Sequence, residues 1–457
     1  MKKIPKLRET INISIKEGVF SYLFKTVAGS DSVFITKFAI LLGATPIHFS
    51  LIAIVGTISQ IFQPLGIILS NRLNYSKSSI IKTVAIGRSL AFLFGLVPIL
   101  VSGEYAINTF LILLFISTSI QAVGANAWIG WISDLIPGKI RGRYFSWRIQ
   151  TSMISGIVFG YLLSILIDLF DKDRGKLAGV ILTKLKNPLI FLNTKLIYVF
   201  FIVFFIASLI GIWGLIILSK HPEGLRKKSE LSLPGQMLIP FKDSNFRKLL
   251  MFGFWWMFAL GIGAPFWHPF LLQKLQMTMI ELQIYITIRL VAAVISLRFW
   301  GHLIDKFGNK HTMSMVISLC GFTPLLWLFA TKSHYWFIFL EALGSGAAFA
   351  GSEIILRNFV LSIAPSESRQ IYSGVFGAFT GLAMTITMLL SGVFIPEPME
   401  ILWIHLEPEQ VLFGITGFAR WTTSFSLMWI NEPNAISYKG FLKYFFGKRF
   451  PRLFKDD

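Results

Sequence analysis

Long apolar stretches separated by short polar segments dominate the pattern of this chain. Most of them extend over about 20 to 27 residues, the length that an α-helix needs to cross the hydrocarbon core of a bilayer. In the first half the pattern predicts helices at 17–42, 47–70, 79–102, 106–131, 146–168 and 195–219. After a polar linker, it predicts six more at 247–273, 278–304, 311–331, 334–361, 371–395 and 410–430. We therefore predict an all-α integral membrane protein with about 12 transmembrane helices.

The two halves repeat each other. Pro137, Arg141 and Tyr144 recur at the same mutual spacing as Pro365, Arg369 and Tyr372, at an offset of about 228 residues. A second match aligns 71–74 with 305–308. This repeat predicts two six-helix bundles, 1–219 and 247–432, joined by a cytoplasmic linker at 220–246 and followed by a basic cytoplasmic tail at 433–457.

Composition supports the membrane assignment and excludes other classes. The chain is 54% hydrophobic and only 14% charged, with a mean hydropathy of +0.66, whereas soluble domains are nearer about 25% charged. The net charge of +20 indicates contact with the anionic lipids of the bilayer rather than with nucleic acid. The single Cys320 and the seven scattered histidines form no cluster for a metal, a cofactor or an enzyme active site. A P-loop pattern is also missing, which excludes direct ATP hydrolysis by this chain.

The distribution of Lys and Arg predicts the orientation. These residues gather in the segments that lie inside if both termini are cytoplasmic, so we expect a multi-pass protein of the cell membrane with a retained first helix. The acidic segment 394–410 agrees, because it faces outward in this topology. The basic loop 168–195 does not agree, and we interpret it as an interfacial segment whose role the sequence leaves open.

A short motif between the eighth and ninth predicted helices carries a family resemblance. Gly301, Asp305, Lys306, Gly308 and Lys310 stand in a loop that resembles the signature of the major facilitator superfamily. The resemblance implies a monomeric secondary transporter that moves a small molecule by alternating access. Gly308 permits a positive φ, and Asp305 can offset the positive end of a helix.

The resemblance also implies a gate. Lys306 and Lys310 would form a charged cytoplasmic latch with Arg141 and Arg143, and Arg369 is the repeat equivalent of Arg141. In the tenth helix, Glu353 and Arg357 are one turn apart, so they can pair as a structural or gating ion pair.

Charges inside predicted membrane helices are the candidate site residues, because a buried charge in a bilayer needs a partner, water or a function. Asp31, in a polar break of the first helix, is the strongest candidate. It is either a proton-coupling carboxylate or a structural partner of Lys25 or Lys37. Lys37 itself either lines the pathway or extends its stem to the membrane interface.

Five further side chains complete the set. Arg289 lies deep enough in the eighth helix to meet an anionic substrate or an acidic partner, whereas Arg88 lies near a helix end and is expected to reach the interface. Trp267 and His268 can stack on substrate and relay protons, or can simply anchor the seventh helix. Asn126 is a cavity candidate in the fourth helix.

The repeat also aligns two interruptions. An offset of about 233 residues places Ser30, Asp31 and Ser32 against Gly263, Ala264 and Pro265, which predicts a binding site where the first and seventh helices face each other. We expect an ion- or proton-coupled transporter of a small solute. A lipid flippase or scramblase and a polytopic membrane enzyme are the alternatives, and the sequence leaves the substrate, the coupling ion and the direction of transport open.

Overall fold

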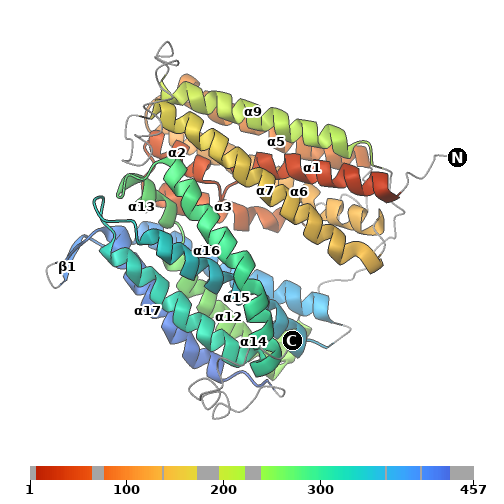
Figure 1. Cartoon of the computed structure of the whole chain (residues 1–457), viewed down its shortest axis with the longest axis vertical. Coiled ribbons are helices and arrows are strands. Elements are labelled where there is room, and N and C mark those ends of the chain that lie inside the picture. The colour runs from red at the N-terminus through yellow and green to blue at the C-terminus, as the bar shows by residue number, and fades with distance from the viewer. Residues whose placement is uncertain are drawn as a thin grey trace. The chain divides into compact units, whose positions relative to one another are not determined.

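The computed structural model describes residues 7–63, 77–135, 138–171, 195–221, 238–365, 368–401 and 404–432. Helices make up most of this part of the chain (Figure 1). The chain separates into two compact units. Unit 1 comprises Met1–Glu230 and Pro265–Ile284, and unit 2 comprises Leu231–Ala264 and Tyr285–Asp457.

Unit 1 is built from long apolar helices that pack side by side. Its elements are α1 (Leu7–Ala28), α2 (Val33–Leu41), α3 (Pro46–Ser59), η1 (Gln60–Phe62), α5 (Lys77–Leu100), α6 (Tyr105–Leu135), α7 (Gly138–Phe170), α9 (Leu196–Leu218) and α13 (Trp267–Gln273). The most extensive contacts join α5 to α6 and α9, and α1 to α7 and α9. In Figure 1, α1, α5, α7 and α9 run alongside one another.

Phenylalanines from four helices fill the core of unit 1. Phe38 of α2 lies with its ring centroid 5.1 Å from that of Phe110 on α6 and 5.0 Å from that of Phe204 on α9. Phe94 of α5 contacts the same two rings at 5.4 and 5.6 Å. These edge-on contacts are the favoured geometry for aromatic pairs, and all four rings are fully buried.

Unit 2 surrounds one central helix. Its elements are α11 (Ile239–Lys242), α12 (Ser244–Gly263), most of α14 (Met279–Leu326), η2 (Trp327–Phe329), α15 (Ile338–Ile363), α16 (Arg369–Val393), β1 (Met399–Ile401), β2 (Ile404–Leu406) and α17 (Pro408–Met428). α12 packs against α15, α16 and α17, and its Trp256 is fully buried. The acidic segment predicted to face outward contains the antiparallel β1–β2 hairpin, which pairs Met399 with Leu406.

The first and seventh predicted helices are each interrupted at the position where the internal repeat aligns one with the other. The first predicted helix divides into α1 and α2, with a break between Ala28 and Val33, and the seventh divides into α12 and α13, with a break between Gly263 and Trp267. In contrast, the predicted starts at 17 and 146 were wrong, because α1 begins at Leu7 and α7 at Gly138. Both helices carry polar residues in their added turns, which the search for apolar runs did not include.

A positive φ separates the eighth predicted helix from the ninth. α14 is continuous by its hydrogen bonds, but Gly308 has φ 83° and ψ 170°. A side chain at this φ is strained, so the glycine in the predicted turn has the conformational role that we expected. Within the described residues, eight helices are long and apolar enough to cross a membrane, and one of them spans both sides of Gly308. This result is consistent with the predicted number of crossings.

Backbone contact between α14 and α15 depends on a glycine. A Cβ at Gly346 would lie 2.1 Å from the carbonyl oxygen of Arg289, whereas a Cβ at Gly377 of α16 meets nothing within 4 Å. We predict that Gly346→Ala lowers the stability of the detergent-solubilised protein by about 1 to 3 kcal/mol, because the two backbones must separate. Thermal unfolding measures the change. Gly377→Ala is the matched control and should unfold at the parent temperature.

Candidate functional site

The break between α1 and α2 presents one exposed ion pair. The Asp31 carboxylate lies 3.3 Å from the Lys25 ammonium, and the two side chains are 69% and 63% exposed. Ser32 begins α2, because its hydroxyl accepts a hydrogen bond from the Phe34 N–H at 3.1 Å. The structure thus pairs Asp31 with Lys25, one of its two predicted partners, at the surface of unit 1.

Lys37 has a different partner. Its ammonium lies 2.5 Å from the Asp171 carboxylate, just beyond the end of α7, and both side chains are 11% exposed. The two roles predicted for Lys37, in the pathway or at the membrane interface, both stay predictions. Sequence reasoning missed Asp171 because it follows the apolar run of its helix and lies in the loop that we assigned to the interface.

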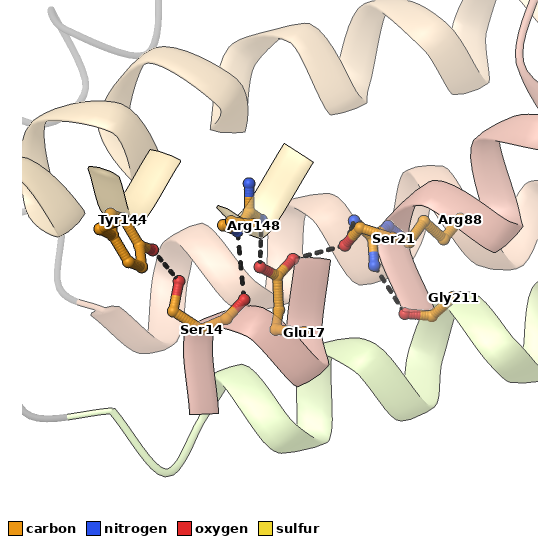
Figure 2. Close-up of polar contacts among 7 residues, drawn as sticks. All are labelled: Ser14, Glu17, Ser21, Arg88, Tyr144, Arg148 and Gly211. Atoms are coloured by element: carbon orange, nitrogen blue, oxygen red, sulfur yellow. Dashed lines mark hydrogen bonds and ion pairs between the residues drawn. The ribbon is translucent and has the colours of Figure 1, made fainter. Parts of the chain in front are cut away.

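A buried ion pair joins α1 to α7. Arg148 donates a hydrogen bond to Glu17 Oε2 at 2.7 Å and, through Nε, a second to the Ser14 carbonyl oxygen at 3.1 Å (Figure 2). Glu17 is 3% exposed. Gly18 leaves the space for the guanidinium, because a Cβ there would lie 2.7 Å from Arg148 Nε. Tyr144 and Ser14 add a hydroxyl contact at the next turn of α1.

Ser21 extends this ion pair into a network with a second arginine. Its hydroxyl donates to Glu17 and accepts from Arg88 Nη2 at 2.7 Å, and Arg88 Nη1 donates to the Gly211 carbonyl oxygen at 2.7 Å. Figure 2 shows Glu17 between Arg148 and Ser21, with Arg88 beyond Ser21. Arg88 is buried, so the prediction that it reaches the interface was wrong. The network holds two arginines and one carboxylate from α1, α5 and α7.

Unit 2 has its own buried polar cluster. Arg289 and Arg420 lie over the ring of Phe349, with guanidinium carbons 5.1 and 5.3 Å from its centroid. Tyr285 donates a hydrogen bond to Glu341 at 3.1 Å, and the charge of Arg289 acts on the same carboxylate. Glu341 is 4% exposed. Sequence reasoning missed Glu341, which lies in the first turn of α15 and has no charged neighbour one turn away.

The signature loop is anchored inside unit 2. Glu432, which follows α17, accepts hydrogen bonds from the N–H groups of Asn309 and Lys310 at 2.9 and 2.8 Å. The Lys310 ammonium donates to the carbonyl oxygens of Met428 and Ile430 at 2.8 and 2.9 Å. Lys310 therefore caps the C-terminal end of α17, a role that the sequence did not indicate.

The other predicted site residues have varied environments. Asp305, Arg143, Arg369, Glu353 and Arg357 are exposed, and Gly301, Lys306, Trp267 and His268 are half-buried. No ion pair joins Glu353 to Arg357 in the part of the chain that the structure describes. The side chains of Asn126 and Arg141 lie outside the described residues. Across the described ranges, no group of three or more His, Cys, Asp or Glu side chains could hold a metal ion.

Part of the chain matches the model of a known family. The family model of the Major Facilitator Superfamily matches residues 250–406, which include the signature loop. The chain has the major facilitator fold. The resemblance noted in the sequence is thereby confirmed, as is the prediction of an all-α membrane protein. No curated protein sequence matches the chain.

Solved structures share this major facilitator fold over nearly the whole chain. A mutant form of the nucleoside transporter NupG is 14% identical, with a TM-score of 0.65 over 93% of this chain and 100% of its own. The inward-open xylose transporter XylE from E. coli is 16% identical, with a TM-score of 0.59 over 94% and 98%. A bacterial homologue of the iron transporter ferroportin is 12% identical, with a TM-score of 0.61 over 93% and 98%.

Removal of one partner of the Glu17–Arg148 ion pair should destabilise unit 1 strongly. Arg148→Met leaves the Glu17 carboxylate buried without its cation, so we predict a loss of about 3 to 5 kcal/mol in thermal unfolding of the solubilised protein. Adding Glu17→Gln to that variant removes the uncompensated charge and should restore most of the loss. Arg143→Met, an exposed arginine of the same helix, serves as the control. Equal losses in the single and double variants would contradict the prediction.

Proposed function

We propose that the chain is a secondary active transporter that moves a small solute across the cell membrane by alternating access, coupled to a proton or another ion. The observation that carries this proposal is the buried network of Glu17, Arg148 and Arg88 inside apolar helices of a transporter fold. Buried charges in such helices are costly and mark ion and substrate pathways more often than they serve stability.

Several features of the sequence are part of the same proposal. The protein would act as a monomer in a bilayer with anionic lipids, with both termini cytoplasmic. Its bundles would correspond to 1–219 and 247–432, with the linker at 220–246 and the tail at 433–457 in the cytoplasm. The exposed Asp31–Lys25 pair supports a water-filled pathway along the α1–α2 break, because two charges facing lipid would be expensive.

A ligand screen followed by flux measurement tests the proposed function. The structural neighbours include a nucleoside transporter, a xylose transporter and a bacterial homologue of an iron transporter. The first panel therefore contains a nucleoside, D-xylose and ferrous iron, together with organic anions and amphipathic cations. A substrate should raise the unfolding temperature of the purified protein. The same compound should exchange across proteoliposomes that contain the protein and accumulate when a proton gradient is imposed. Movement of labelled phospholipid without solute flux would instead favour a scramblase.

Asp31 is the proposed coupling carboxylate. Asp31→Asn keeps the shape of the protonated acid, so we predict that it abolishes gradient-driven accumulation and preserves exchange of the substrate found in the screen. Lys25→Gln is the control, because it breaks the same ion pair and leaves the carboxylate able to titrate. Full accumulation by Asp31→Asn would show that this residue is only a partner of Lys25, and would direct the same test to Glu17.

Asp305 is proposed to hold the cytoplasmic latch together with Lys306, Lys310, Arg141 and Arg143, and Arg369 is the repeat equivalent of Arg141. Asp305→Asn removes a charge that can stabilise a helix N-terminus. Labelling of introduced cysteines from the cytoplasmic side should therefore increase while expression stays normal. Unchanged labelling would leave the loop as a folding element that Glu432 anchors.

A further inference from the structure

A segment of 20 residues lies in the second half of the sequence but packs with the unit that contains the first half. Pro265–Ile284 lies in unit 1, although Ala264 before it and Tyr285 after it lie in unit 2. The segment contains α13 and the first turn of α14. Any movement of one unit against the other must therefore detach this segment from unit 1 or bend the chain at both of its ends.

One carboxylate of unit 1 binds the segment at its helix N-terminus. Asp168, in the last turn of α7, accepts hydrogen bonds from the Met279 N–H at 2.9 Å and the Ile280 N–H at 2.8 Å, one on each oxygen. It is 1% exposed. The carboxylate also lies at the positive end of the α14 dipole, where a negative charge is favourable.

The remaining N–H groups of this turn are satisfied within the segment. The Thr278 N–H donates to Glu281 Oε2 at 2.8 Å, and the Glu281 N–H donates to Thr278 Oγ1 at 3.2 Å. This reciprocal capping needs no partner outside the segment. The α14 N-terminus can thus remain folded when Asp168 departs, because only two N–H groups then need water.

Two further contacts hold the segment on unit 1, and one of them involves a glycine. α13 contacts α2, and a Cβ at Gly160 of α7 would lie 2.9 Å from Oε1 of Gln283. The nearby Lys37–Asp171 ion pair joins α2 to the residue after α7. Both residues of that ion pair lie outside the segment, so it offers an internal comparison.

We propose that Pro265–Ile284 is a releasable clasp and that Asp168 is the positioning residue that keeps it on unit 1. The clasp rests on the proposed function, because alternating access supplies the movement that releases it. Release exchanges two N–H···carboxylate hydrogen bonds for hydrogen bonds to water, which makes the contact specific and reversible. Asp168 therefore sets how often the segment leaves unit 1.

Cysteine labelling without substrate or gradient tests the clasp. In a Cys320→Ala background, Met277→Cys places a thiol where the parent side chain is 2% exposed. We measure its reaction rate with a polar maleimide in the purified protein in nanodiscs. Asp168→Asn keeps one acceptor oxygen but turns an NH₂ group towards the second N–H, so labelling should accelerate about tenfold or more.

Two further variants decide between a clasp and a general loss of packing. Asp171→Asn is the same change at the next turn and should label at the parent rate. Gly160→Leu crowds Gln283 without altering charge and should accelerate labelling, which keeps the test decisive if Asp168→Asn does not fold. Parent-rate labelling in both Asp168→Asn and Gly160→Leu, or equal acceleration in Asp171→Asn, would overturn the proposal. Because this assay contains no substrate, it gives its answer whether or not transport is detected.

Discussion

The structure depends on one constraint, which is that a charge inside an apolar helix bundle must have a partner. In unit 1 the Glu17–Arg148 pair meets it, and Ser21 carries the same network on to Arg88. Such a pair adds little net stability over an apolar one, because each ion loses its hydration. Its presence therefore fits the transport role that we propose, in which a buried charge has a use besides holding the helices together.

Glycines make these buried charges possible. Gly18 gives Arg148 the space to reach α1, and Gly211 offers Arg88 both room and a carbonyl acceptor. In unit 2, Gly346 allows α15 to approach the backbone of α14 at Arg289, whose guanidinium shares Phe349 with Arg420. The polar clusters thus require close helix approach, and close helix approach requires residues without side chains.

Helix ends carry the other charged contacts. Asp168 satisfies the α14 N-terminus in unit 1, and Glu432 satisfies the backbone after Gly308 in unit 2. In each case one carboxylate accepts hydrogen bonds from two successive backbone N–H groups. These contacts place charge at the positions where the chain changes direction, so they link the local geometry of a turn to a distant element.

The sequence alone determined the features that depend on local pattern. Apolar runs predicted the membrane helices, the repeat located the breaks at Asp31 and Ala264, and Gly308 marked the positive φ between two helices. Only the tertiary structure decided the partners. Arg148 and Glu17 are 131 residues apart, and Asn309 and Glu432 are 123 apart, so no local spacing could pair them. The helix starts at Leu7 and Gly138 also needed the structure, because the added turns carry polar residues such as Arg8 and Arg143, which interrupt an apolar run without ending a helix.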